Sequence, residues 1–132
     1  MRAISKVDSK GRITIPMFIR EELNIEPDSY VEMEYSREDR ALVIRPLTRA
    51  GELLVDIHVE LSDVDQLQRA LSTIINEGSE IRMLRCVLAN DRYGCVITAV
   101  VIDFTIANTI RESLVGSGVN VTRLAPVTRK VG

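Results

Sequence analysis

The sequence contains no tryptophan and few other aromatic residues, three tyrosines and two phenylalanines among 132 residues. It also lacks an apolar run near the roughly 18 residues that a transmembrane helix needs, because the longest run, CVITAVVI, includes a threonine. The opening residues, MRAISKVDSK, lack the apolar stretch of a secretion signal. We therefore expect a cytoplasmic protein without a membrane segment.

Cysteine is scarce, with Cys86 and Cys95 alone, and neither a CxxC spacing nor a His/Cys cluster accompanies them. This pattern predicts reduced, partly buried thiols rather than a structural disulfide. Motifs for nucleophilic or paired-carboxylate catalysis and for a glycine-rich phosphate loop are also missing. We expect neither an enzyme nor a protein with a bound cofactor.

The one histidine, His58, lies between Asp56 and Glu60 in an alternating segment, which places the three side chains on one face of a predicted strand. Alternate residues on a strand are about 6.6 to 7 Å apart. A shared metal ion would therefore require the side chains to bend inward. The favoured interpretation is a polar sheet or dimer face, and a metal site is the alternative.

Charge is distributed unevenly along the chain, although the net charge is only −2. Residues 1–20 contain five Lys or Arg and one Asp, whereas residues 21–39 contain eight carboxylates and one Arg. A basic segment next to an acidic one can orient a domain on a polyanion. The alternative is two solvated faces that differ in sign.

The segment Val7–Pro16, VDSKGRITIP, has the pattern of a turn between two extended arms. Asp8–Gly11 is a turn signal, and Arg12–Ile15 alternates polar and apolar residues as a strand does. Pro16 is suited to the start of a helix over MFIREEL that ends at Asn24. Two further strands, at Tyr30–Tyr35 and in ALVIR before Pro46, complete a unit too small to bury a stable core alone, so we expect it to dimerise.

The rest of the chain predicts a second domain. Residues 48–52 form a linker, residues 53–124 read as βαββαβ, and residues 125–132 form an exposed tail. This order is that of ferredoxin-like domains, in which two helices cover one face of a four-stranded sheet. The expected elements are a strand at Leu53–Leu61, a helix capped by Ser62 and ending at Gly78, strands at Ile81–Ala89 and Cys95–Phe104 joined by residues 90–94, a helix capped by Thr105, and a strand at Val119–Leu124.

Residues 1–47 resemble the swapped-hairpin DNA-binding domain of the AbrB/SpoVT/MazE family. The resemblance rests on KVDSKGRITIP, IREEL, PDS, VEMEY and ALVIRPL, in family order and spacing. It implies that two chains interleave their hairpins and grip double-stranded DNA. Glu21 departs from family members that place a second arginine directly after the helix arginine. By motif position the resemblance assigns DNA contacts to Lys6, Lys10, Arg12 and Arg20, and a role in shaping the backbone to Gly11 and Pro16.

Residues 53–124 more loosely resemble an ACT-like regulatory domain, a ferredoxin-like module that often pairs and binds small molecules at the pair interface. The turn at Glu60–Val64 lacks the Pro-Gly of amino-acid-binding ACT domains, which argues against an amino acid as the ligand. A small-molecule effector is what this resemblance implies, and its identity is left open.

Together these features predict an α+β protein: a swapped-hairpin domain over residues 1–47 and a ferredoxin-like, ACT-like domain over residues 53–124. The leading hypothesis is a DNA-binding transcriptional regulator that is a homodimer or a tetramer. Two alternatives are an antitoxin that binds a toxin protein and a small-molecule-binding subunit without a DNA role.

Overall fold

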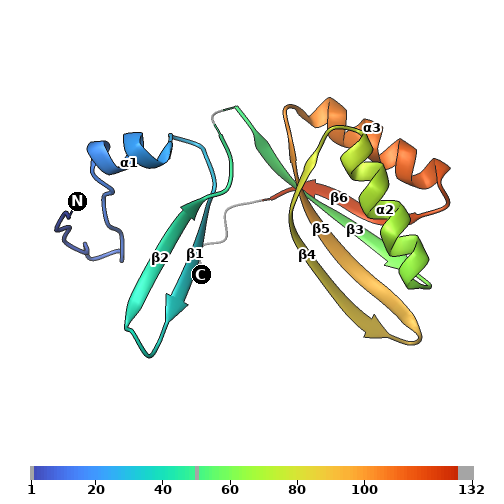
Figure 1. Ribbon diagram of the computed structural model, residues 1–132, viewed down its shortest axis with the longest axis horizontal. Helices are drawn as coiled ribbons and strands as arrows, with labels where there is room; N and C mark the ends of the chain where they lie inside the picture. The colour runs from blue at the N-terminus through green and yellow to red at the C-terminus, as the bar shows by residue number, and fades with distance from the viewer. Residues whose placement is uncertain (1, 50, 128–132) are drawn as a thin grey trace. The chain divides into compact units, whose positions relative to one another are not determined.

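The computed structural model describes residues 2–49 and 51–127. The chain divides into two compact units, residues 1–50 (unit 1) and residues 51–132 (unit 2) (Figure 1). This boundary lies within the segment 48–52 that the sequence predicts as a linker. None of the helices in the described part of the chain is long and apolar enough to cross a membrane.

Unit 1 contains helix α1 (Met17–Leu23) and a hairpin of strands β1 (Val31–Ser36) and β2 (Ala41–Pro46) (Figure 1). The strands are antiparallel, with Val31 opposite Pro46. The helix ends at Asn24, which adopts a left-handed conformation with φ 54°. Asn24 N and Ile25 N donate to the carbonyl oxygens of Glu21 and Arg20, so a Schellman-type pair of bonds closes the helix. The predicted helix and hairpin are confirmed.

The predicted strand at Arg12–Ile15 is not formed in the described chain. The turn at residues 8–12 is present, with Asp8 N 2.9 Å from the Arg12 carbonyl oxygen. Beyond the turn, Thr14 N donates to the Ser5 hydroxyl at 3.3 Å, a side-chain contact that does not continue a backbone ladder. The two arms lie extended on either side of the turn without the paired backbone that defines a strand.

Unit 1 has no hydrophobic core of its own, because every buried hydrophobic side chain in the described residues lies at Leu54 or beyond. Ile4, Val7 and Ile13 on the two arms are 101%, 60% and 47% exposed. Tyr35 and Leu42 on the hairpin are exposed as well. Within one chain, these apolar side chains of unit 1 are therefore left exposed to solvent.

Unit 2 is a four-stranded antiparallel sheet with strand order β4-β5-β3-β6, covered on one face by two helices (Figure 1). This order and connectivity are those of the ferredoxin-like fold, so the α+β prediction is confirmed. The elements are β3 (Leu53–Leu61), α2 (Val64–Asn76), β4 (Glu80–Ala89), β5 (Arg92–Val101), α3 (Phe104–Gly116) and β6 (Asn120–Pro126).

The core of unit 2 follows from the alternation along β3. Val55, Ile57, Val59 and Leu61 are buried against the helices, and the residues between them face the other side of the sheet. The helices complete the core with apolar residues at helical spacing, Ala70, Ile74, Ala107, Ile110 and Leu114.

Both helix starts in unit 2 differ from the predicted caps. Asp63, rather than Ser62, caps α2, and its carboxylate accepts from Gln66 N at 2.8 Å. Asp103, rather than Thr105, caps α3, and accepts from Thr105 N and Ile106 N. An aspartate is as good a cap as serine or threonine, so the sequence offered neighbouring candidates of similar strength.

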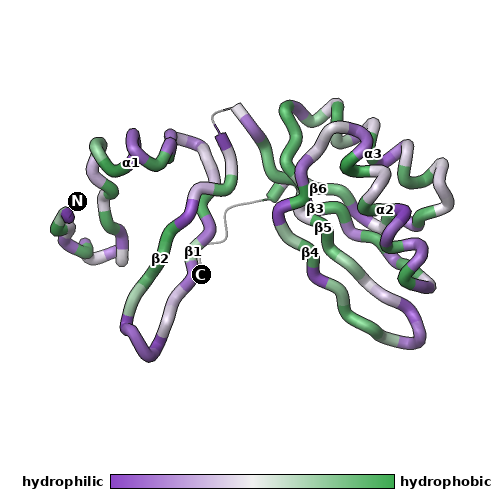
Figure 2. The backbone as a smooth tube through the Cα atoms, viewed as in Figure 1, coloured by the Kyte–Doolittle hydropathy of each residue, from purple (hydrophilic) through white to green (hydrophobic). Residues whose placement is uncertain are grey.

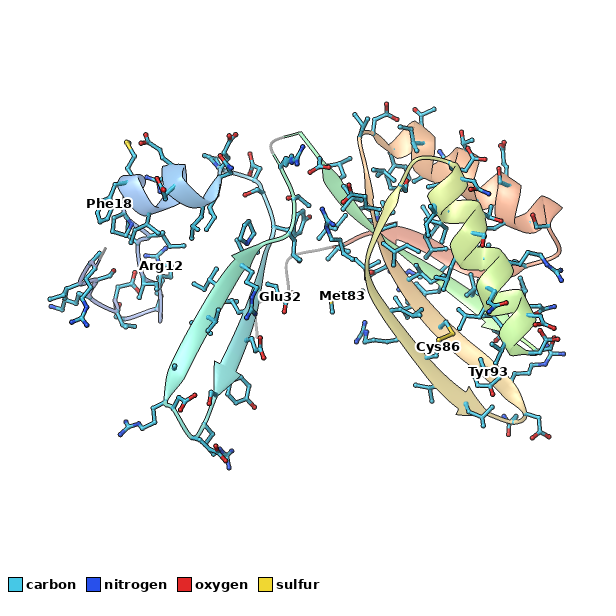
Figure 3. The ribbon with its side chains drawn as sticks, viewed as in Figure 1. Arg12, Phe18, Glu32, Met83, Cys86 and Tyr93 are labelled. Atoms are coloured by element: carbon cyan, nitrogen blue, oxygen red, sulfur yellow. A yellow bond between two sulfur atoms is a disulfide. The ribbon has the colours of Figure 1, made fainter. Side chains whose placement is uncertain are left out.

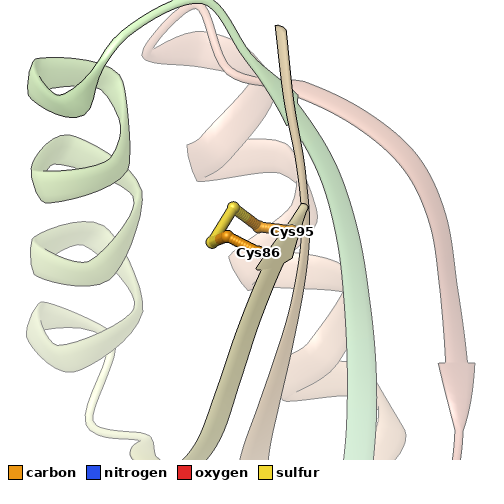
Figure 4. Close-up of a disulfide and its surroundings, with 2 residues drawn as sticks. All are labelled: Cys86 and Cys95. Carbon is orange, nitrogen blue, oxygen red and sulfur yellow. A yellow bond between two sulfur atoms is a disulfide. The ribbon is translucent and has the colours of Figure 1, made fainter. Parts of the chain in front are cut away.

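The prediction of reduced cysteines was wrong, since Cys86 and Cys95 form a disulfide (Figure 4). The turn between β4 and β5 is shorter than predicted and consists of Asn90 and Asp91, which have φ 54° and 60°. Positive φ at both central residues is the mark of a two-residue type I′ turn. With this turn, Cys86 lies directly opposite Cys95 in the register.

The C-terminal boundary of the last strand was also misplaced. β6 continues to Pro126, with Ala125 opposite Asp56 and Pro126 opposite Val55, where the sequence predicted an exposed tail. Val127 N further donates to the Leu54 carbonyl oxygen at 2.9 Å. The rest of the predicted tail, residues 128–132, lies outside the described residues.

Candidate nucleic-acid interface

The turn of unit 1 is organised around the Asp8 carboxylate. Asp8 Oδ1 accepts from the backbone N–H groups of Lys10 and Arg12, each at 2.9 Å. Asp8 Oδ2 accepts from Arg12 Nε at 2.8 Å. Three donors thus converge on one carboxylate and fix the path of the backbone between two cationic side chains.

These bonds favour the ionised form of Asp8. The backbone and side-chain hydrogen bonds from Arg12, followed by the backbone bond from Lys10, hold the pKa of the Asp8 carboxyl below its ordinary value. The negative charge belongs to the turn and partly neutralises Arg12. The Lys10 side chain is exposed on the same turn.

Lys6, Lys10 and Arg12 are all exposed, and Arg12 is labelled at the turn in Figure 3. Gly11 has φ 77°, a conformation that a residue with a Cβ rarely adopts, and its N–H donates to the Asp8 carbonyl oxygen. Gly11 therefore takes a left-handed conformation within the turn, and its role in shaping the backbone for DNA stays a prediction. The role of the three cations in DNA contact stays a prediction.

Arg20 is in a different setting from the turn cations. Its Nε donates to the Ile15 carbonyl oxygen at 2.9 Å, and the side chain is half-buried. Arg20 therefore ties α1 to the arm that precedes it, next to Pro16, which stands at the N-cap of the helix. It also borders a depression of about 340 Å³ shared with Glu21 and Asn24.

An apolar groove of about 230 Å³ lies beside the turn-bearing arm in unit 1. Sequence reasoning identified its individual apolar residues but not that they form one groove. Its walls come from the arm, from α1 and from β2, and include Ile13, Ile15, Ile19, Leu23, Ile25 and Ile44.

Two hydroxyl residues contribute contacts that the sequence did not indicate. Ser5 Oγ accepts from Thr14 N, which holds the two arms together near the turn. Thr48 is 3% exposed, and its Oγ1 accepts from Tyr30 N at 2.9 Å. A lone serine or threonine carries no sequence signal for such a bond, because the partner is distant along the chain.

The candidate metal residues are not brought together. Asp56 Oδ1 accepts from Thr98 Oγ1 at 2.6 Å, and Glu60 Oε2 accepts from Asn120 Nδ2 at 3.3 Å. Both carboxylates thus bond across to neighbouring strands rather than toward His58. Within residues 2–49 and 51–127, no group of three or more His, Cys, Asp or Glu side chains is placed to hold a metal ion.

Comparisons with known proteins bear on unit 1. Residues 4–52 match the sequence model of the family described as "Antidote-toxin recognition MazE, bacterial antitoxin". No curated protein matches the chain. The resemblance of residues 53–124 to ACT-like domains stays a prediction.

One solved structure, titled "De novo designed protein Foldit4", is similar to part of the chain. It has a TM-score of 0.46 and 13% sequence identity, and the match covers 60% of this chain and 99% of the designed one. A likeness of this strength supports no conclusion about the fold or the function.

The family match and the geometry agree on the same segment, where a basic turn, a short helix and a hairpin follow in order. Residues 4–52 of this chain are therefore a domain of the AbrB/MazE swapped-hairpin type.

Proposed function

We propose that the protein is a homodimeric DNA-binding regulator whose unit 1 grips duplex DNA with the turn cations of two chains. The observation that carries the proposal is that unit 1 combines a rigid, basic turn with an apolar surface that one chain leaves uncovered. A second copy of unit 1 is the partner that this proposal requires.

Dimerisation follows from the energetics of the uncovered surface. Burial of apolar area contributes about 25 cal/mol per Å², and unit 1 gains little of this within one chain. The apolar groove that includes Ile13, Ile15 and Ile44 would bind the corresponding arm of a second copy. A two-fold dimer would then present two copies of the turn on one surface.

DNA binding follows from the charge and rigidity of that turn. Phosphate contacts dominate the affinity of proteins for DNA, and fixed cations make such contacts without ordering a flexible loop first. Lys10 and Arg12 flank a backbone that the Asp8 carboxylate already holds. These contacts would position the protein, whereas reading of a sequence would require additional contacts to base edges.

The test is duplex binding over a series of salt concentrations with Lys10→Ala. This variant keeps the backbone N–H that donates to Asp8 and removes one exposed cation per chain. Two lost phosphate contacts per dimer should make the slope of log K against log salt shallower by about two units. The matched control is Arg37→Ala, which removes an exposed cation from the β1–β2 turn and should leave the slope unchanged.

Two results would contradict this proposal. A wild-type dimer that binds no duplex at low salt would rule out the DNA role. A Lys10→Ala slope equal to that of wild type would rule out the site while leaving the role in place.

The description of the matched family favours a second function, neutralisation of a toxin protein. Antitoxin segments that bind toxins are commonly extended and fold on the partner. Unit 2 instead has a core of its own, which weighs toward regulation. Failure of a folded dimer to bind duplex would favour the antitoxin function.

Unit 2 would then couple the affinity of unit 1 for DNA to oligomerisation or to the binding of a small-molecule effector. A ligand that favours one arrangement of two units 2 would change DNA affinity by linkage. Thermal shifts against amino acids, nucleotides and divalent metal ions test the effector role. No shift with any of them would leave oligomerisation as the role of unit 2.

A further inference from the structure

Strand β4 is an edge of the unit 2 sheet that exposes apolar side chains on both of its faces. Within the described sheet β4 pairs with β5 alone. Met83 and Val87 on one face are 44% and 69% exposed, and Leu84 and Leu88 on the other are 41% and 61% exposed. Figure 2 shows β4 as hydrophobic over much of its length. Proteins usually protect such an edge, because its free backbone groups recruit another strand.

The opposite edge of the sheet carries that protection, whereas residues 83–89 of β4 contain neither a bulge nor a proline. On β6 the register with β3 shifts between His58 and Val59, and the strand ends in a proline. Bulges and prolines both discourage edge pairing. The register shift on β4 lies before Met83, so residues 83–89 are a regular strand.

The Cα distance across the disulfide identifies the backbone groups of β4 that point outward, away from β5. The Cα atoms of Cys86 and Cys95 are 4.1 Å apart, close to the 4.5 Å typical of a non-hydrogen-bonded antiparallel pair. In such a pair both backbone N–H and C=O groups point away from the partner strand. The outward groups of this edge therefore belong to Leu84, Cys86 and Leu88.

The side chains of the same three residues lie on the helix-covered face of the sheet. Figure 4 shows the Cys86 sulfur on the side of the sheet where α2 lies, and Cys95 opposite it is buried in the core. Met83 projects from the other face (Figure 3). A strand added at this edge would thus meet apolar side chains on both faces.

We propose that β4 pairs antiparallel with β4 of a second copy of this chain, about a two-fold axis at Cys86. This pairing deepens the oligomerisation role proposed for unit 2. It places Leu84 opposite Leu88 of the partner subunit, twice by symmetry, and Arg85 opposite Val87 of the partner subunit. In this register the outward N–H and C=O groups of Leu84, Cys86 and Leu88 pair with those of the same three residues in the second copy.

Other two-fold registers that match outward groups are less favourable. An axis at Arg85 places two arginines directly opposite, which is destabilising. An axis at Leu84 places Leu88 opposite Glu80 of the partner subunit and extends over the register shift. An axis at Val87 shortens the pairing, because β4 ends at Ala89. Residues 83–89 are thus most self-complementary about Cys86.

A strand pair of this length buries less area than a typical stable interface of about 1,600 Å². Dimerisation of unit 1 would raise the effective concentration of the second unit 2 and so support a weak contact. Pairing within one unit 1 dimer gives a closed dimer, and pairing between two dimers gives a tetramer. The edge contact is the same in both assemblies.

The experiment is cross-linking of the full chain through Cys86. Cys95→Ala leaves Cys86 as the single thiol, and hydrogen-bonded antiparallel pairs have Cα atoms about 5.5 Å apart, within disulfide range. Diamide accepts the two electrons and two protons that two thiols lose on forming the bond. Non-reducing electrophoresis should then show at least tenfold faster dimer formation than for Val115→Cys in a Cys86→Ala, Cys95→Ala background.

A second substitution tests the edge itself. Leu88→Lys, added to Cys95→Ala, places a cation at the proposed leucine pair and should slow the cross-linking at least fivefold. Val115→Lys in the same background changes a helix residue of similar exposure, 57%, and should leave the rate unchanged. Equal cross-linking rates for the Cys95→Ala and Val115→Cys variants, or no effect of Leu88→Lys, would overturn the proposal.

A measurement on the wild type covers the case in which a variant does not fold. The amide hydrogens of Leu84, Cys86 and Leu88 should exchange at least tenfold more slowly than exposed amides of the β4–β5 turn. Fast exchange at all three would also overturn the proposal. These readouts do not involve DNA, so they are separate from the duplex-binding test of the proposed function.

Discussion

Among single residues, Asp8 has the least expected role, because a carboxylate lies at the centre of a predicted polyanion-binding turn. It accepts from two backbone N–H groups and one guanidinium. Charge alone would make Asp8 unfavourable near phosphate. Its geometric role is to hold the backbone of the turn between Lys10 and Arg12, together with the Arg12 guanidinium.

The variant Asp8→Ala tests whether Asp8 affects DNA binding mainly through its negative charge or through the hydrogen bonds that shape the turn. Removal of a negative charge should strengthen DNA binding, whereas loss of the turn bonds should weaken it. We expect the geometric effect to dominate and the dissociation constant to rise by about three- to tenfold, because three donors of the turn lose their common acceptor. Fluorescence anisotropy with a labelled duplex measures this dissociation constant.

The control for this prediction is Glu22→Ala, which removes an exposed carboxylate from α1 without touching the turn. Its binding should be equal to or tighter than wild type. Tighter binding by both variants would show that Asp8 acts only through its charge.

The lowered pKa of Asp8 gives a pH prediction with a definite sign. The ionised carboxylate is favoured in the folded turn, so its stabilising contribution is present above the unfolded pKa of about 3.9 and is lost as the pH falls through the lower folded value. A carboxyl NMR titration should give Asp8 a midpoint below that of an unfolded reference peptide. A midpoint equal to or above the reference would contradict the turn geometry.

Among the elements, the β4–β5 hairpin differs most from its sequence-based prediction. The disulfide joins strands that the two-residue turn already brings together. Closing a loop of this size contributes about 2.5 kcal/mol by the chain-entropy relation. The free energy of unfolding of Cys86→Ala should therefore be lower than that of wild type by roughly this amount.

Urea unfolding with and without a reductant checks this value. Reductant should lower the stability of the wild type and leave the Cys86→Ala variant unchanged. A wild type that is insensitive to reductant would mean that the bond does not stabilise the fold.

The cap of α3 gives a second prediction at this scale. Asp103→Ala should lower the free energy of unfolding by about 1 kcal/mol, because two N–H groups lose their acceptor. Thr105→Ala, at the position favoured by the sequence, should have a much smaller effect. Thermal unfolding of the two variants side by side distinguishes the caps, and a larger effect of Thr105→Ala would contradict the structure.

The sequence-based predictions were correct for elements whose structure depends mainly on residues that are close in the sequence. The alternation along Leu53–Leu61 and the helical spacing after it depend only on neighbours, and both elements formed as predicted. The disulfide depended on the strand register set by the turn between β4 and β5, which is shorter than the turn predicted from the sequence. A strand pattern at Arg12–Ile15 produced no ladder in the described chain, and the proposed second copy of unit 1 would supply the missing partner.

The candidate site was predictable where it rests on a motif and not where it rests on tertiary contacts. The positions of Lys10, Gly11 and Arg12 follow from the turn signal. The half-buried bond of Arg20 to the Ile15 carbonyl oxygen has no such signal. The apolar groove likewise emerges only when three separate segments fold together.

In the whole molecule, the two units differ in how they gain stability. Unit 2 has a buried core, whereas unit 1 has apolar side chains that a single chain leaves exposed. The folding of unit 1 should therefore depend on protein concentration, as in obligate dimers. The variant Ile13→Asp should unfold unit 1 and leave unit 2 folded.

Hydrogen exchange with mass spectrometry on the full-length variant can follow both units at once. We expect loss of protection in β1 and β2 and unchanged protection in β3 and β5. The control is Val115→Asp, an equivalent change at an exposed site of α3. Protected β1 and β2 in the Ile13→Asp variant would show that unit 1 folds without its partner.

The bonds around Tyr30 have a mechanical consequence. Tyr30 N donates to Thr48 Oγ1 and the Tyr30 carbonyl oxygen accepts from Leu47 N, at the open end of the β1–β2 hairpin next to the boundary with unit 2. A pull on the chain beyond Thr48 would act on these two bonds at the open end of the hairpin before it reached the β1–β2 ladder. Loss of the Thr48 hydroxyl should therefore lower the force needed to open this end of the hairpin.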